Sequence, residues 1–193
     1  MPPSSSRRPS MSNPDRGRLL TALARAAIAR EFGMTTPTLP HPAWLNEPGA
    51  VFVTLTRNGQ LRGCIGSLEA HRALGLDLED NAQAAAFRDP RFPALGYDEL
   101  AQINVEVSIL SKPAAMRFTD EADALAQLRP GIDGVIFKSG WRRSTFLPQV
   151  WEQLPEPRQF MAHLKLKAGL AADYWSDDIQ LSRYSVEKFK ESP

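Results

Sequence analysis

The sequence predicts an α+β fold built on a mixed, mainly antiparallel sheet that is flanked by helices. Three observations carry this prediction. An Asn58-Gly59 pair joins two β-rich runs, which is the strongest short-range signal of a β-hairpin. The stretch "INVEVSIL" alternates apolar and polar residues from Ile103 to Ile109, as a strand does. Alanine-rich stretches with helical spacing separate these strand-like runs.

The first expected element is a helix over residues 18–33, "RLLTALARAAIAREFG", where apolar residues recur on one face and Gly33 is a stop signal. The next stretch, "MTTPTLPHPAWLNEPG", contains four prolines and is expected to be an extended loop. Its Trp44 is expected to help the loop cover the core.

The predicted hairpin consists of strands 51–57 and 60–66, and a two-residue type I′ turn pairs Arg57 with Gln60. On that register Val53 lies opposite Cys64. One face then holds the side chains of Val51, Val53, Leu55, Arg62 and Cys64, and the other holds those of Phe52, Thr54, Leu61 and Ile65. Both faces are partly apolar, so a central hairpin that is covered on both sides is expected.

The remaining elements alternate between helices and strands. An alanine-rich helix is expected within 72–88, with Gly75 delaying its start, before the loop "DPRFPAL" and the strand 103–109. A helix near 120–128 precedes a second hairpin that turns at Ser139-Gly140. "PQVWEQL" and "PRQFMAHLKLKAG" are expected to be short helices, the second ending at Gly169, and "IQLSRYSVEKF" a closing strand.

The chain of 193 residues is long enough for one domain with a full core, and its 42% hydrophobic and 23% charged residues are typical of a globular protein. The formal net charge of +1 excludes a strong overall attraction to nucleic acid or membranes. No apolar run reaches the roughly 20 residues of a transmembrane helix, and no secretory signal is expected. A single cysteine excludes an intramolecular disulfide and indicates a reducing compartment.

The beginning of the chain differs in composition from the rest. Serine, proline and arginine dominate "MPPSSSRRPSMSN", so residues 1–13 are expected to form a flexible tail and residues 14–190 a single domain. A start of translation at Met11 instead of Met1 is an open alternative.

The stretch "LRGCIG", residues 61–66, contains the strongest candidate for chemistry, Cys64. Nearby positive charge favours the reactive thiolate, and Arg62 is two residues away on the same strand. Gly63 and Gly66 remove side chains beside the thiol, which lets a ligand or another backbone segment approach closely.

Other residues complete this candidate site. His71 follows Cys64 by seven residues and would form a Cys–His pair, the usual route to an activated thiol. Glu106, on the polar side of its strand, is a candidate partner for Arg62 or for a histidine. The alternative is a structural role for Cys64, since a free cysteine usually behaves as a small buried hydrophobe and Val53 is its expected neighbour. His71 alone would then be a surface or capping residue.

Several other chemistries are excluded. The three histidines have no metal-ligand spacing with one another or with the lone cysteine, and the sequence has neither a P-loop nor a dinucleotide-binding glycine motif. One cysteine cannot hold an iron–sulfur cluster, so no metal or cofactor is expected. "WRRSTF" and "HLKLK" mix basic with aromatic or apolar residues as an RNA-binding face does, but the near-zero net charge favours solvated surfaces instead.

Beyond single motifs, the chain resembles the AMMECR domain family, and within it the bacterial branch called AmmeMemoRadiSam system protein A. The likeness rests on "VTLTRNGQLRGCIGSLEAHR", "NAQAAAFRDPRF", "INVEVSIL", "GIDGVIF", "FLPQVW" and "HLKLKAGL", which occur in the family's order and span about residues 16–190. The resemblance implies a two-lobed α+β domain with a smaller second lobe. Carried onto this chain, the motif residues of the family are Arg62, Gly63, Cys64, Gly66, Asp89, Arg91, Phe92, Glu106 and Ser108.

The resemblance further implies a cytoplasmic protein that acts with a Memo-like protein and a radical S-adenosylmethionine enzyme. Three functions stay open. In the first, a cleft lined by the LRGCIG motif binds a small molecule or peptide, and Cys64 attacks it as a nucleophile. In the second, the chain is a non-catalytic binding or scaffold module for the two partners. In the third, it is an RNA-binding accessory that uses the basic residues at 141–143 and 158–167.

Overall fold

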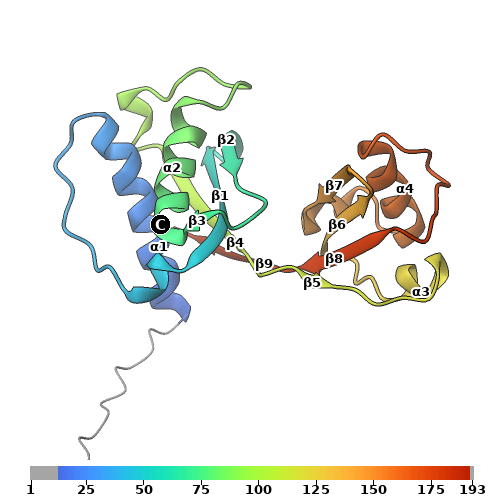
Figure 1. Ribbon diagram of the computed structural model, residues 1–193. Helices are drawn as coiled ribbons and strands as arrows, with labels where there is room; N and C mark the ends of the chain where they lie inside the picture. The colour runs from blue at the N-terminus through green and yellow to red at the C-terminus, as the bar shows by residue number, and fades with distance from the viewer. Residues whose placement is uncertain (1–12, 192–193) are drawn as a thin grey trace, which may run out of the picture. The chain divides into compact units, whose positions relative to one another are not determined.

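The computed structural model describes residues 13–191, and these residues form two compact units (Figure 1). The first unit comprises residues 13–108 and 188–191, and the second comprises residues 109–187. Residues 1–12, which make up almost all of the predicted tail, lie outside the described residues.

The first unit combines helices with a sheet. The helices are α1 (Asn13–Glu31) and α2 (Leu74–Phe87), and the 3-10 helices are η1 (Ala43–Asn46) and η2 (Tyr97–Glu99). The strands are β1 (Pro48–Arg57), β2 (Gln60–Gly66), β3 (Arg72–Ala73), β4 (Ile103–Leu110) and β9 (Val186–Lys190). They follow the order β2-β1-β4-β9, and β3 pairs with β1 beside this path.

Helices α1 and α2 cover one face of this sheet (Figure 1). The two helices pack on each other, α2 packs on β1 and β2, and Phe189 of β9 packs against Gly17 of α1. Alternate strand residues point toward the helices and are buried, among them Val51, Val53, Leu55, Ile103, Val105 and Val107. The opposite face, which we call the outer face, carries the residues that lie between them along each strand.

The second unit has its own sheet and its own core. Its strands are β5 (Ala114–Ala115), β6 (Gly134–Ser139), β7 (Arg142–Phe146) and β8 (Gln180–Tyr184), in the order β5-β8-β6-β7. Its helices are α3 (Glu121–Ala126), η3 (Pro148–Glu152) and α4 (Pro157–Lys167). In the core, the rings of Trp151 and Phe160 stack with their centroids 3.8 Å apart, next to Phe137.

The predicted α+β class is confirmed, and most expected elements are present. Helix α1 contains most of the predicted helix but begins earlier, at Asn13, and Gly33 follows its end with a φ of 72°. Helix α2 begins at Leu74, and β4, α3 and α4 lie where the sequence predicts them. The strands, however, are divided between two sheets.

Two later predictions need correction. The second hairpin turns at Gly140-Trp141, one residue later than predicted, because Gly140 adopts a φ of 54° and Ser139 still pairs with Arg142. The closing strand predicted over 179–189 is interrupted at Ser185, and its two parts, β8 and β9, belong to different sheets. An alternating pattern identifies a strand, but it carries no information on the sheet that the strand joins.

The turn of the first hairpin is confirmed. Asn58 and Gly59 have φ values of 52° and 76°, as a type I′ turn requires, and Arg57 pairs with Gln60.

The predicted pairing of β1 with β2 is wrong beyond the first residues after that turn. A β-bulge at Arg62 leaves this residue without a pairing partner in β1, so that Leu55 pairs with Gly63. Cys64 therefore lies opposite Thr54 instead of Val53. Because one extra residue moves every later side chain to the other face, Cys64 lies on the outer face and not among the buried valines.

Candidate functional site

The main chain of Cys64 is held on both sides by one ion pair from the loop after α2. The Asp89 carboxylate accepts a hydrogen bond from the Cys64 amide, with N and Oδ2 2.9 Å apart. The Arg91 guanidinium donates to the Cys64 carbonyl, with Nη2 and O 3.1 Å apart. Asp89 and Arg91 also bond to each other, with Oδ2 and Nη2 2.7 Å apart. The loop therefore fixes the position of the cysteine on its strand.

Asp89 is buried, and its charge is satisfied by Arg91 and by main-chain amides. The hydrogen bond from the Arg91 side chain, together with those from the amides of Cys64 and Arg91, holds the pKa of Asp89 far below its usual value. Asp89 is thus an anion at neutral pH, and its role is to bind main-chain and guanidinium donors. It is not a proton donor at neutral pH.

The side chain of Cys64 points to the outer face and is partly buried. Its sulfur lies 3.2 Å from the Thr54 hydroxyl oxygen on the neighbouring strand. The structure thus presents a thiol beside a hydroxyl group on a sheet, with its main chain held rigidly by Asp89 and Arg91.

The side chain of Arg62 is engaged in contacts within the fold. Its guanidinium donates to both carboxylate oxygens of Glu99, at 2.9 and 2.8 Å, and to the carbonyls of Pro93 and Ala94. These contacts occupy all but one of the N–H groups of an arginine side chain. Arg62 therefore ties the bulge in β2 to the loop and to η2, and it has little capacity left for a ligand.

Glu99 is the partner that sequence reasoning missed. It lies in η2 and accepts hydrogen bonds from Arg62, from the Gly96 amide and from Arg57. Hydrogen bonds from Arg62, Gly96 and Arg57 lower its pKa to about 2 from the usual 4.5. Glu99 lies 37 residues after Arg62, and no local signal in the sequence identifies it as the partner of that arginine.

The two glycines of the motif are explained by close packing. A Cβ atom on Gly63 would lie 2.0 Å from the Ala85 carbonyl oxygen of α2, and one on Gly66 would lie 2.2 Å from the ring of Phe52. Both distances are shorter than any van der Waals contact. Gly63 lets β2 approach α2, and Gly66 lets β2 approach β1, so neither glycine is needed to admit a ligand.

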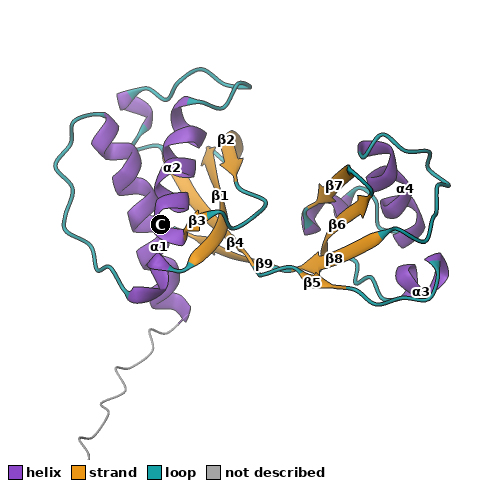
Figure 2. Cartoon of the chain, viewed as in Figure 1, coloured by secondary structure: helices purple, strands orange, loops and turns teal. Residues whose placement is uncertain are grey.

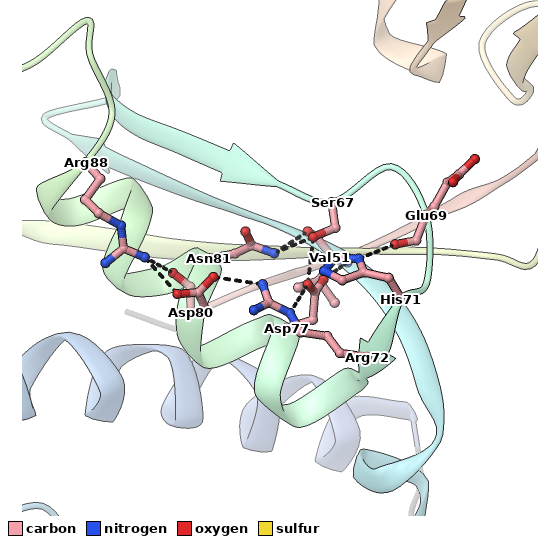
Figure 3. A network of polar contacts seen from close by, with 9 residues as sticks. All are labelled: Val51, Ser67, Glu69, His71, Arg72, Asp77, Asp80, Asn81 and Arg88. Atoms are coloured by element: carbon pink, nitrogen blue, oxygen red, sulfur yellow. Dashed lines mark hydrogen bonds and ion pairs between the residues drawn. The ribbon is translucent and has the colours of Figure 1, made fainter. Parts of the chain in front are cut away.

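A buried polar network holds the end of β2 and the start of α2 (Figure 3). Its centre is Asp77, fully buried in the first turn of α2, which accepts hydrogen bonds from the Val51 amide and from the Ser67 hydroxyl at 3.0 and 2.6 Å. Arg72 donates to the same carboxylate at 2.8 Å, and Asn81 donates to the Val51 carbonyl at 3.2 Å. This network positions the segment 67–71, which follows the motif.

His71 lies in that segment and not beside the thiol. Its Nδ1 atom is 3.0 Å from the carbonyl oxygen of Glu69 (Figure 3). The next residue, Arg72, pairs with Gly49 of β1, whereas Cys64 pairs with Thr54 of the same strand. Five residues of a strand correspond to roughly 16 Å. The structure therefore does not bring Cys64 and His71 together as a dyad.

Glu106 lies on the outer face of β4, but it does not contact Arg62. Its carboxylate is 3.9 Å from the Lys188 ammonium and 3.4 Å from that of Lys190, both on β9. The suggested Glu106–Arg62 pair is thus wrong, because Glu99 is the partner of Arg62. Glu106 and Cys64 share the outer face of the sheet without sharing a hydrogen bond, since β1 lies between their strands.

Several basic side chains of the stretches 141–143 and 158–167 form hydrogen bonds or ion pairs within the second unit. Arg142 donates to the carbonyls of Ala168 and Gly169 after α4, at 3.2 and 2.6 Å. Lys165 is buried and pairs with Glu121, and Lys167 donates to the Thr145 carbonyl. These groups cap and fasten the unit, and their positions give no support to an RNA-binding face.

Two features that residues 13–191 lack bear on function. Within this range, no three side chains of His, Cys, Asp or Glu come together as a metal site. No helix of the same range has the length and the apolar character needed to cross a membrane.

Fold and site together define a class of protein: an α+β protein of two compact units, in which a strand with the motif LRGCIG carries a cysteine whose main chain is held by an ion pair from the loop after α2. The chain belongs to the AMMECR1 family, whose model matches residues 21–189. The site residues suggested by the resemblance to this family stay predictions, because neither the geometry nor the matches assign them a chemical role.

Relatives and a solved structure agree with this assignment. A protein of Methanothermobacter thermautotrophicus is 37% identical over 182 residues, which cover 92% of this chain and 95% of that protein. A protein of Thermotoga maritima is 41% identical over 155 residues, which cover 79% of this chain and 83% of that protein. The crystal structure of the uncharacterized protein PH0010 from Pyrococcus horikoshii matches with a TM-score of 0.76 at 32% identity, covering 91% of each chain.

Proposed function

We propose that the chain is the substrate-binding component of a modification system, and that it binds a small molecule or peptide on the outer face at Cys64. Its resemblance to the AmmeMemoRadiSam system protein A branch suggests the partners, a Memo-like protein and a radical S-adenosylmethionine enzyme, in the cytoplasm. In this proposal the radical enzyme, which has its own cluster, performs the reaction. The chain holds the substrate.

The observation that supports this proposal is the division of roles within the LRGCIG motif. Arg62 is bound to Glu99, and Gly63 and Gly66 allow close packing. Cys64 is the motif residue that has a reactive side chain and no comparable packing task, since its main chain, not its sulfur, carries the bonds to Asp89 and Arg91. A group held in a fixed position by its surroundings is what a binding site requires.

Binding is favoured over nucleophilic catalysis by the groups around the sulfur. A catalytic thiol usually has a general base within hydrogen-bond reach. Here the group at that distance is the Thr54 hydroxyl, which is not a base at neutral pH, and His71 lies in the segment 67–71, beside the start of β1. The nucleophile remains the second candidate because of one observation. The Arg91 guanidinium donates to the Cys64 carbonyl at 3.1 Å, so a positive charge lies next to the residue that carries the thiol.

The decisive experiment is a reconstitution of this chain with purified Memo-like and radical S-adenosylmethionine proteins on a cell extract of peptides and small molecules. Mass spectrometry would follow any mass change that requires all three proteins. We expect Cys64→Ser to lower the yield of modified product at least about tenfold, and the exposed outer-face variant Asn104→Ser to leave it unchanged. A full yield with Cys64→Ser, or the same yield without this chain, would contradict the proposal.

A further inference from the structure

A cavity of about 480 Å³ lies beside α1 in the first unit, far along the sequence from the LRGCIG motif. Its floor is a stripe of small side chains on the helix, Ala22, Ala26 and Ala29. Its other wall is the segment after the helix, where Met34, Pro37 and Leu39 line it. Small-molecule sites in proteins are typically apolar hollows of about 300–1,000 Å³, so the cavity has the size and the lining of such a site.

The cavity exists because of the segment that connects α1 with η1. This segment bows away from the helix (Figure 2). Pro37, Pro40 and Pro42 have no amide hydrogen and keep the segment out of regular secondary structure. The alanines of α1 are too short to fill the space beneath it. Met34, on the segment, is 40% exposed and presents an apolar side chain that a ligand would cover.

The charged residues of the cavity have different roles. Arg25 is committed within the fold, because it pairs with Glu191 and donates to the carbonyls of Leu100 and Ile103 at 2.8 and 2.7 Å. The positive charge of Arg25 is thus balanced by the negative charge of Glu191. Arg18 lines the same cavity with a side chain that is 71% exposed, and it pairs with Asp15, itself 49% exposed.

An exposed ion pair of this kind contributes little to stability, so Arg18 can exchange its partner for an anionic ligand at small cost. The cavity therefore has an apolar interior in which the charges of Arg25 and Glu191 neutralise each other. At its rim, Arg18 supplies a positive charge that a ligand can bind. This combination complements a molecule with an apolar body and a single negative charge.

We infer that this cavity binds a small amphipathic organic anion, with its apolar body against the alanine stripe and Met34 and its carboxylate, or an equivalent acidic group, at Arg18. The inference is independent of the function proposed for Cys64, because no residue is shared between the two sites. A bound anion would also hold the segment 34–39 against α1.

Two fluorescent probes test the inference on the full chain. Anilinonaphthalene sulfonate has an apolar body and one negative charge, and N-phenyl-1-naphthylamine has a similar body and no charge. We expect saturable binding of both probes with one molecule per chain. Binding of the sulfonate should be tighter, and Arg18→Gln should weaken it by up to about fivefold while leaving the neutral probe unchanged.

Two further variants test the apolar part of the site. Ala22→Leu fills the cavity from the helix, and Met34→Ser removes an apolar wall from an exposed position, so that at least the second variant should fold normally. We expect both to weaken both probes, Ala22→Leu by about tenfold or more. Arg30→Gln, another exposed arginine of α1, and Ala101→Leu, an exposed alanine elsewhere, are the matched controls and should leave both affinities unchanged.

The results that would overturn the inference are specific. Binding that Ala22→Leu and Met34→Ser leave intact would place the probes elsewhere. Equal effects of Arg18→Gln and Arg30→Gln would show that Arg18 is not the anion partner. Absence of saturable binding, in a protein whose melting temperature shows it to be folded, would show that the cavity is not a ligand site.

Discussion

Cys64 and Thr54 lie directly opposite each other on neighbouring strands, with Sγ and Oγ1 3.2 Å apart. The β-bulge at Arg62 produces this pairing, because without it Cys64 would face Val53 in the buried layer. The thiol consequently has a polar neighbour that can donate or accept a hydrogen bond. This relationship determines how the cysteine responds to substitution.

Cys64→Ser is expected to change the free energy of unfolding by less than about 1 kcal/mol, because the serine hydroxyl can bond with Thr54. The matched control is Val53→Ser, at the fully buried position next to Thr54, which should cost about 3 kcal/mol by placing a hydroxyl in the core. Denaturant unfolding of both variants measures the difference. Similar large losses in both would mean that Cys64 is a core residue.

Arg62→Ala is expected to destabilise the protein by about 3–5 kcal/mol. The substitution leaves the Glu99 carboxylate, which is largely buried, without its main partner. The side chains of this pair are only 11% and 14% exposed. Arg57 bonds to the same carboxylate but is 39% exposed, so Arg57→Ala should cost about 1 kcal/mol or less. Equal costs for the two arginines would contradict the structural role of Arg62.

Stability should fall as the solution becomes acidic, and Glu99 should be one cause. Its pKa is about 2 in the folded protein and 4.5 by its usual value, so the unfolded state binds more protons between these values. The contribution of Glu99 is therefore complete above about pH 5 and is lost as the pH falls toward 2. Asp89, whose pKa is also lowered, acts in the same direction. Unfolding free energies measured from pH 6 to pH 2 should decrease less steeply for Glu99→Gln than for the wild type.

Gly63→Ala is expected to destabilise the protein by about 3 kcal/mol or prevent folding, since the new methyl group would overlap the Ala85 carbonyl. Gly75→Ala is the control. Gly75 lies within α2, and a Cβ atom there would meet Leu45 at an ordinary 3.4 Å, so this substitution should be neutral or stabilising by up to about 1 kcal/mol. Tolerance of alanine at position 63 would show that β2 can move away from α2.

The elements of the fold could be predicted because their signals are local. The Asn58-Gly59 turn, the alternation in β4 and the alanine-rich helices depend on residues close together in the sequence. The bulge at Arg62 could not be predicted, because it depends on a glutamate and two carbonyls from a distant loop. One extra residue in β2 was enough to place Cys64 on the wrong face in the prediction.

The candidate site was predictable in part for the same reason. The association of Asp89 and Arg91 with Cys64 was suggested by resemblance, and the structure supplies its physical basis in hydrogen bonds to the cysteine main chain. The pairing of Cys64 with His71 was suggested by their closeness in sequence. The intervening segment, however, leads the chain back to the start of β1, where β3 pairs with Gly49.

The central claim is that Cys64 presents its thiol on the outer face of a folded protein, where a substrate can reach it. The most direct test is the rate of alkylation by iodoacetamide in the absence of denaturant and at low denaturant concentrations. The account predicts that Cys64 is alkylated in the native state, much faster than the protein unfolds, at a rate that low denaturant does not change. Alkylation that occurs only through global unfolding, and accelerates with denaturant in parallel with it, would contradict the claim.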